Sequence, residues 1–250
     1  MNEYINLTLD NIDEEHICCA IGDKKHQNGV NRKKEWIKNK LNDGHVFRKL
    51  NARGKTFIEY ENLNNAWVPI DGNNYNYIYC LWVAGSFKGK GIGKELLEYA
   101  INDTKEKGLS GICTLSSKKK KPFIGEKKFY EHFGFKVVDE IGDYELLALQ
   151  FDNNETPKFT ESARKMEVNN EDFTIYYSNE CPYVEYEVEE LTNYAKDNNI
   201  KIHFIKIDSL DKAKNAPCIF NNWANFYKGK FISNTILNAN SLKKLLDEQK

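Results

Sequence analysis

A glycine-rich turn between an apolar run and an amphipathic run constrains the fold of this chain most strongly. The turn spans residues 83–94 and holds glycines at positions 85, 89, 91 and 93. Glycine has no Cβ atom, so backbone N–H groups can converge there on an anion. The N-terminus of the following helix adds partial positive charge, and Lys88, Lys90 and Lys94 add full charges. The pattern predicts a strand–turn–helix unit that binds a phosphate or pyrophosphate.

Two common phosphate-binding motifs do not match this turn. A Walker A loop requires Ser or Thr after Gly-Lys, but Glu95 follows Gly93-Lys94. A dinucleotide fingerprint that starts at Gly89 needs glycine where Lys94 stands, and one that starts at Gly91 needs it where Leu96 stands. A turn that binds no ligand is the alternative, and the neighbouring lysines favour a phosphate site over it.

Two segments carry a resemblance to a known family. Lys88 followed by Gly91-Ile92-Gly93 resembles motif A of the GNAT N-acetyltransferases, with Lys88 where Gln or Arg is usual. Residues 129–135, Phe-Tyr-Glu-His-Phe-Gly-Phe, resemble the second GNAT signature. The resemblance spans residues 1–151. The phrases Ala66–Pro69 and Cys80–Val83 make the chain similar to the YoaP-like acetyltransferases, which carry an additional C-terminal domain.

The resemblance implies an α/β (α+β) fold in which helices flank a mixed GNAT sheet, and it implies acetyl-CoA as cosubstrate. The strand Tyr75–Val83 would splay from its neighbour, and an amine acceptor would attack the thioester directly in the resulting cleft. A backbone N–H near Val83 would stabilise the oxyanion. The cofactor-binding residues implied by the family are Leu81, Trp82, Val83, Lys88, Gly89, Lys90, Gly91, Ile92, Gly93 and Lys94.

The catalytic residues follow from motif position and from strand geometry. Tyr130 matches the family position that protonates the CoA thiolate; the alternative is a core tyrosine. The strand at 75–83 holds no carboxylate, so we expect the general base that deprotonates the amine on the preceding strand. Glu59 and Glu61, two residues apart, lie on one face of that strand and are candidates that would act through water. Their alternative is a structural role.

The 250 residues predict two domains. The first is the GNAT domain at 1–151, in which residues 14–21 are predicted to form a short helix. Residues 152–172 are polar and turn-forming and are predicted to be a linker. The second domain, 173–250, has the order strand, Cys-Pro, helix, strand, Ala-Pro, hairpin, helix, which resembles a smaller thioredoxin-like α/β domain.

The thiol chemistry of the second domain centres on Cys181. The segment Cys181-Pro182-Tyr183 resembles the start of a glutaredoxin site, but Val184 replaces the second cysteine, which excludes two-cysteine exchange through this motif. A helix N-terminus is expected to lower the pKa of Cys181. Pro217 lies where thioredoxin-like folds carry a cis-proline. This match would bring Cys218 near Cys181, where the two thiols could form a reversible disulfide or bind a soft ligand. The alternative is a domain for packing or substrate capture.

Composition narrows the class of function. Lys and Arg total 36 against 37 Asp and Glu, so bulk nucleic-acid binding is not expected. No apolar run reaches the roughly 18 residues of a membrane span, and the first residues lack signal-peptide features, so a cytoplasmic protein is predicted. Six cysteines without a CxxC pair indicate free thiols and no metal site.

Three functions remain open at this point. The leading hypothesis is an N-acetyltransferase that acts on a small amine-bearing molecule or peptide. A non-catalytic CoA-binding or thiol-sensing protein is the second. A thiol oxidoreductase on a GNAT scaffold is the third. The oligomeric state is not indicated by any pattern.

Overall fold

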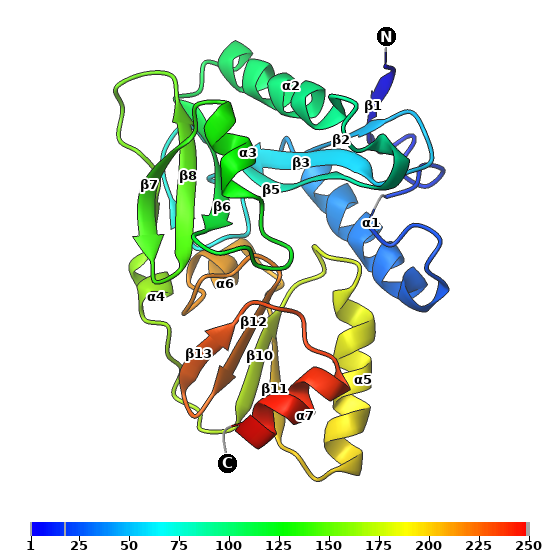
Figure 1. Cartoon of the computed structure of the whole chain (residues 1–250), viewed down its shortest axis with the longest axis vertical. Helices are drawn as coiled ribbons and strands as arrows, with labels where there is room; N and C mark the ends of the chain where they lie inside the picture. The colour runs from blue at the N-terminus through cyan, green and yellow to red at the C-terminus, as the bar shows by residue number, and fades with distance from the viewer. Residues whose placement is uncertain (1, 18, 249–250) are drawn as a thin grey trace.

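The N-terminal part of the chain forms a mixed sheet, and the C-terminal part forms a smaller sheet below it in Figure 1. The computed structural model describes residues 2–17 and 19–248. In this part of the chain the larger sheet has seven strands in the order β1-β2-β3-β5-β6-β8-β7. Its strands are β1 (Tyr4–Asn6), β2 (Val46–Leu50), β3 (Thr56–Asn62), β5 (Tyr75–Val83), β6 (Gly111–Ser117), β7 (Lys136–Ile141) and β8 (Tyr144–Gln150). The predicted mixed α/β fold class is confirmed.

Helices cover both faces of the larger sheet. On one face, Trp36 and Ile37 of α1 pack in the same apolar cluster as Tyr77 of β5. On the other face, Leu96 of α2 packs in a second cluster with Ile78 of β5. Successive residues of β5 thus point to opposite faces, as strand geometry requires. The helices of this part are η1 (Lys24–His26), α1 (Gln27–Leu41), η2 (Gly85–Phe87), α2 (Ile92–Glu106) and α3 (Lys127–His132).

The strands β5 and β6 diverge partway along the sheet. They pair in parallel only from Tyr75 opposite Gly111 to Ile78 opposite Thr114. On its other side, β5 stays paired with β3 as far as Val83 opposite Thr56. The last five residues of β5 therefore have strand β3 on one side only, and the expected splay is confirmed.

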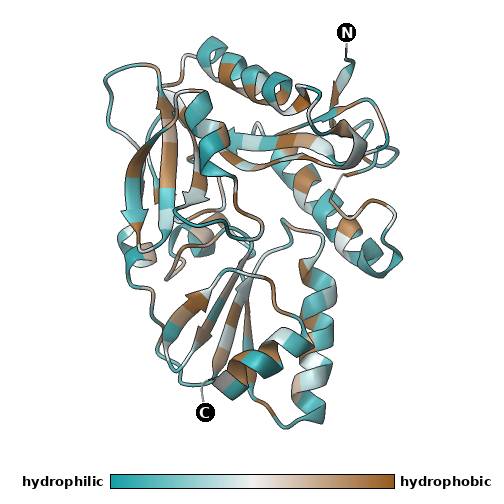
Figure 2. Cartoon of the chain, in the orientation of Figure 1, coloured by the Kyte–Doolittle hydropathy of each residue, from teal (hydrophilic) through white to brown (hydrophobic). Residues whose placement is uncertain are grey.

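The C-terminal unit is a four-stranded sheet with helices packed on it. Its order is β11-β10-β12-β13, with β10 parallel to β11 and antiparallel to β12. Figure 2 shows apolar residues concentrated on its strands, whereas α5 and α7 alternate between polar and apolar residues. The elements are β10 (Phe173–Tyr177), α5 (Val184–Asp197), β11 (Ile202–Lys206), α6 (Leu210–Lys214), β12 (Trp223–Tyr227), β13 (Lys230–Ser233) and α7 (Ala239–Glu248).

The segment predicted as a linker has structure of its own. It forms β9 (Lys158–Phe159), which pairs with β4 (Ile70–Asp71), and then α4 (Glu161–Arg164). Phe159 is buried in the core of the larger sheet. A bridge between Glu167 and Lys230 joins the end of the segment to the smaller sheet. The connection is therefore packed against both units.

The two units meet closely beside α1. A Cβ atom at Gly29 would lie 1.9 Å from the carbonyl oxygen of Pro182, so only glycine allows this approach. The hydroxyl of Tyr183 donates a hydrogen bond of 2.7 Å to the backbone oxygen of Cys19. Ile219 contributes to the core of the larger sheet. These contacts fix the turn after β10 against the N-terminal unit.

The structure corrects two local predictions. Residues 14–17 and 19–21 form turns, a bend and irregular backbone without a helix, so the predicted helix at 14–21 is wrong; Cys18 lies outside the described residues. Ile17 and Ala20 are nevertheless buried, since tertiary contacts, including the Lys49–Glu15 ion pair, hold the segment. The peptide bond before Pro217 is trans, because no cis peptide occurs in the described part of the chain. None of the helices described is long and apolar enough to cross a bilayer.

Candidate active site

A cavity of about 390 Å³ lies where β5 has left β6 and where the C-terminal unit meets the sheet. One wall consists of β5 residues Leu81, Trp82 and Val83, with Lys88 beside them. The opposite wall comes from the C-terminal unit. Its residues are Glu180, Cys181, Pro182, Tyr183, Asn221 and Asn222. The loop at 120–126 and Tyr130 of α3 also line the cavity, together with a group of residues from the larger sheet and its surroundings: Cys19, Lys33, Glu59, Tyr79, Cys80 and Thr114. Residues far apart in sequence therefore form one site.

The glycine-rich turn lies beside this cavity. Gly85, Gly89 and Gly91 have φ angles of 64°, 75° and 78°, with nothing within 4 Å of a Cβ atom at any of them. Glycine is thus required for the backbone conformation and not for space. Gly91 is the N-cap residue of α2 and makes no side-chain cap. The first N–H groups of α2 are therefore available to an anion.

The predicted cofactor residues divide between cavity and turn. Leu81, Trp82, Val83 and Lys88 line the cavity. The remaining predicted residues, 89–94, follow on the turn and on the first turn of α2. Lys88, Lys90 and Lys94 are exposed, so their charges face solvent at the mouth of the site. This arrangement suits a ligand with an anionic end outside and a neutral end in the cavity.

Tyr130 lies on α3, lines the cavity and is 2% exposed. Burial raises the pKa of its phenol, while a hydrogen bond with Thr114 acts in the opposite direction. The phenol therefore carries its proton at neutral pH. A Cβ atom at Gly125 would lie 2.6 Å from the Tyr130 ring, so the loop packs closely against the phenol. Position and protonation state both suit proton donation into the cavity.

Glu59 lines the cavity but has protein partners on both oxygens. Lys33 Nζ lies 2.6 Å from Oε2, and His45 Nε2 lies 3.1 Å from Oε1. Burial opposes ionisation of Glu59, but the charge of Lys33 and the hydrogen bond to His45 outweigh it, so its pKa is lowered. A carboxylate stabilised in this way is a weak proton acceptor.

A comparison of the whole sequence identifies the family. The "Uncharacterized N-acetyltransferase YoaP" of Bacillus subtilis is 37% identical over 246 residues, which cover 98% of each chain. The chain belongs to the YoaP-like GNAT N-acetyltransferases. Two family models match parts of this N-acetyltransferase: the acetyltransferase (GNAT) domain over residues 54–137 and the YoaP-like model over residues 201–244.

Solved GNAT structures are more distantly similar. The PaiA N-acetyltransferase of Thermoplasma acidophilum, in complex with coenzyme A, is 19% identical with a TM-score of 0.43. A GNAT acetyltransferase of Staphylococcus aureus is 21% identical, also with a TM-score of 0.43. Both alignments cover 60% of this chain and 99% of the other.

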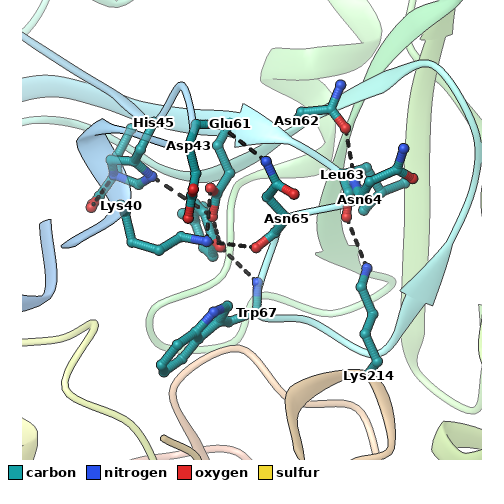
Figure 3. Close-up of polar contacts among 12 residues, drawn as sticks. Lys40, Asp43, His45, Glu61, Asn62, Leu63, Asn64, Asn65, Trp67 and Lys214 are labelled. Carbon is teal, nitrogen blue, oxygen red and sulfur yellow. Dashed lines mark hydrogen bonds and ion pairs between the residues drawn. The ribbon is translucent and has the colours of Figure 1, made fainter. Parts of the chain in front are cut away.

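Glu61, the second predicted base of this YoaP-like chain, is not among the residues that line the cavity. It lies in a buried network, shown in Figure 3 together with Lys40 and His45. Lys40 Nζ is 3.0 Å from Glu61 Oε2, and the hydroxyl of Tyr79 donates to Oε1. Lys40 also donates to the backbone oxygen of Asn65 at 2.6 Å. These contacts give Glu61 a structural role in joining α1 to β3.

Glu180 is a cavity residue of this YoaP-like chain that no sequence pattern indicated as a site residue. It precedes Cys181 in the turn after β10 and is 5% exposed. Its Oε2 atom is buried without a hydrogen-bond partner among the described residues. Burial and the negative charge of Glu59 raise its pKa well above the ordinary value. The only sequence signal was its place beside the candidate thiol, because no local pattern distinguishes it from a surface glutamate.

Three thiols also line the cavity: Cys19, Cys80 and Cys181. A hydrogen bond from Cys80 lowers the pKa of Cys19, while the same bond and burial raise that of Cys80. Within residues 2–17 and 19–248, no group of three or more His, Cys, Asp or Glu side chains is arranged to hold a metal ion.

The structure places Cys181 and Cys218 in different environments. Burial raises the pKa of Cys181 to about 12, so the predicted lowering by a helix N-terminus is wrong. The helix α5 begins only at Val184, and apolar packing decides the shift. Cys218 is fully buried in a separate apolar cluster with Phe220 and Phe226. Both thiols are free, and they belong to different apolar clusters.

Proposed function

We propose that this YoaP-like protein transfers the acetyl group of acetyl-CoA to the amine of a small acceptor by direct attack. The single observation that carries the proposal is the cavity between the end of β5 and the C-terminal unit. It joins the glycine-rich turn on one side to a second wall of polar residues on the other. Two reactants could therefore enter from opposite sides and meet in it, which lowers the barrier by orientation.

The donor would occupy the side formed by β5 and the turn. Its pyrophosphate would receive hydrogen bonds from the first N–H groups of α2 and charge from Lys88, Lys90 and Lys94. Its pantetheine would follow the open edge of β5 at Leu81–Val83, where strand β6 is no longer paired. A backbone N–H of this edge would stabilise the oxyanion that forms at the thioester carbonyl.

Tyr130 would act as the general acid. Its buried phenol retains a proton and lies in the cavity wall. As the amine displaces the thiolate, the phenol would protonate the sulfur, and no covalent intermediate with the protein would be needed.

The C-terminal unit would serve as the acceptor wall. We infer a thioredoxin-like arrangement for residues 173–250 from its strand order, in which the first strand lies between the second and third and only the first two are parallel. The separate burial of Cys181 and Cys218 favours packing and substrate capture over disulfide exchange. The alternative function is CoA binding without transfer, with the cavity thiols as a sensor.

Product analysis separates these two functions. The protein is incubated with acetyl-CoA and a panel of primary amines, and acetylated amine and free CoA are quantified by mass spectrometry. This readout avoids thiol reagents, which would react with the protein's own cysteines. Equal amounts of acetylated amine and CoA are expected. Calorimetric binding of acetyl-CoA without acetylated product from any amine would contradict the proposed transfer and support the alternative.

A further inference from the structure

One buried carboxyl of the cavity has no ion-pair partner among the described residues. Glu59 is held by Lys33 and His45, and Glu61 by Lys40 and Tyr79. Glu180 forms no ion pair with any described residue, although it is only 5% exposed, and its Oε2 has no hydrogen-bond partner. A buried oxygen without a partner costs free energy unless a ligand supplies a donor.

A second unpaired acceptor lies on the same wall. Asn222 Oδ1 is also buried without a hydrogen-bond partner among the described residues, and Asn222 lines the cavity together with Glu180. Both orphan atoms are oxygens, so the missing ligand group is a donor. A primary ammonium offers three N–H donors and a positive charge, whereas a phosphate or carboxylate offers none.

We propose that Glu180, supplied by the C-terminal unit, binds the ammonium of the acceptor and removes its proton before attack. This inference rests on the proposed acetyl transfer. It assigns the proton acceptor to a residue outside the GNAT sheet. The two predicted bases within that sheet, Glu59 and Glu61, already have ion-pair partners. The close contact of Gly29 with Pro182 holds the turn that carries Glu180 against the N-terminal unit.

The protons and electrons of this step balance. The positive charge of the bound ammonium favours the ionised form of Glu180. The ammonium nitrogen then gives one proton to the Glu180 carboxylate at Oε2, and its freed electron pair forms the C–N bond to the acetyl carbonyl carbon. The C–S bond breaks and its electron pair stays on sulfur, which takes the Tyr130 proton. The nitrogen's second proton restores Tyr130. The products are the N-acetylated amine, CoA thiol and a protonated Glu180, which releases its proton to solvent.

The rim of the cavity indicates what carries the amine. Phe123 lies in the lining, is 41% exposed and has a φ angle of 62°, which is uncommon for a bulky residue. Its ring centroid is 6.3 Å from that of Tyr183 on the opposite wall. Two aromatic rings at the entrance would pack against an aromatic or apolar body. The acceptor class is therefore a primary amine on an aromatic or apolar body.

The test uses tyramine as probe and 4-ethylphenol as its counterpart without the amine. In the wild-type protein with CoA bound, calorimetry is expected to show tighter binding of tyramine by at least about tenfold. Equal binding of the two compounds would overturn the inference, and this measurement needs no variant to fold.

The variant Glu180→Gln keeps the size of the side chain and removes the carboxylate. Its kcat/KM for tyramine is expected to fall about 100-fold or more, as for loss of a general base, with acetyl-CoA affinity unchanged. The matched control is Glu189→Gln on the exposed side of α5, which should leave kcat/KM unchanged. Unaltered kcat/KM in Glu180→Gln would overturn the inference while acetyl transfer stood. Absence of transfer in the wild type, with tyramine binding still lost in Glu180→Gln, would overturn the proposed function and support the amine site.

Discussion

Lys33 Nζ lies 2.6 Å from Glu59 Oε2, and both side chains are buried. The two residues are 26 positions apart, one on α1 and one on β3, and the pair joins the helix to the sheet in the lining of the cavity. Together with Lys40 and Glu61 it makes the contact between α1 and β3 ionic as well as apolar.

Removing one member of this pair should be strongly destabilising. Lys33→Met leaves the Glu59 carboxylate buried without its main counterion, which typically costs about 3–5 kcal/mol. Urea unfolding should show the loss, and the double variant Lys33→Met/Glu59→Gln should recover much of it. A loss in Lys33→Met below about 1 kcal/mol would show that the ion pair is not needed to hold Glu59.

Tyr130→Phe should separate catalysis from binding. Loss of the proton donor is expected to lower kcat by about 100-fold or more, while the dissociation constant of acetyl-CoA stays the same. Tyr194→Phe on α5, which lies outside the cavity lining, is the matched control and should retain full activity. A Tyr130→Phe protein with wild-type kcat would rule out the phenol as general acid.

The glycines of the turn should differ in their tolerance of alanine. Gly91 has a φ angle of 78°, so Gly91→Ala should cost about 1–2 kcal/mol of stability through backbone strain. Gly93 lies within α2, has ordinary contacts of 3.7 Å or more at its Cβ position, and should accept alanine with little change or a gain. Thermal unfolding of both variants checks this. Equal losses of stability in the two variants would show that the positive φ angle is not the reason for glycine at position 91.

Among Cys19, Cys80, Cys113, Cys181 and Cys218, alkylation should be fastest at Cys19. Its pKa is lowered by the hydrogen bond from Cys80, whereas those of the other four are raised, chiefly by burial for Cys113, Cys181 and Cys218. The thiolate is the reactive form, so a low pKa favours reaction. Peptide mapping after brief exposure to iodoacetamide measures the order, and Cys80→Ser should slow the modification of Cys19. Preferential labelling of Cys181 would contradict the assignment.

Glu180 should make stability depend on pH in a defined direction. Its folded pKa is raised, by burial first and then by Glu59 and Glu61 against the opposing charges of Lys33 and Lys40. Between its unfolded pKa of about 4.3 and its higher folded pKa, the folded state binds more protons, so the free energy of unfolding decreases as pH rises.

Glu180→Gln removes this contribution. The stability of the variant relative to wild type should therefore increase as pH rises through that window, as followed by urea unfolding at a series of pH values. A difference that stays constant with pH would show that the Glu180 pKa is the same in both states.

Local patterns in the sequence were sufficient for much of the fold and for the glycine-rich turn beside the cavity. The strand–turn–helix around Gly91 was recognisable because its glycines and lysines lie between an apolar run and an amphipathic run. The motif at Tyr130 was recognisable by its resemblance to the second GNAT signature. The apolar face of α2 was visible because its residues repeat with the helical period. The prediction of a helix at 14–21 was wrong because contacts with distant segments bury the apolar residues there. Their spacing therefore does not reflect a helical repeat.

The charge environment of the cavity carboxyls was decided by tertiary structure alone. No local sequence pattern gives Glu59 and Glu61 an ion-pair partner. The fold, however, brings Lys33 and Lys40, on one face of α1, beside them. In the sequence Glu180 resembles an ordinary surface glutamate. The turn after β10 nevertheless places it in the cavity, where it forms no ion pair with a described residue. Local sequence specifies propensity and short-range geometry, whereas the charge environment of a buried group depends on residues brought close by folding. For that reason the sequence by itself determined the family, the sheet and the glycine-rich turn, and the tertiary structure decided which buried carboxylate of the cavity has no ion-pair partner among the described residues.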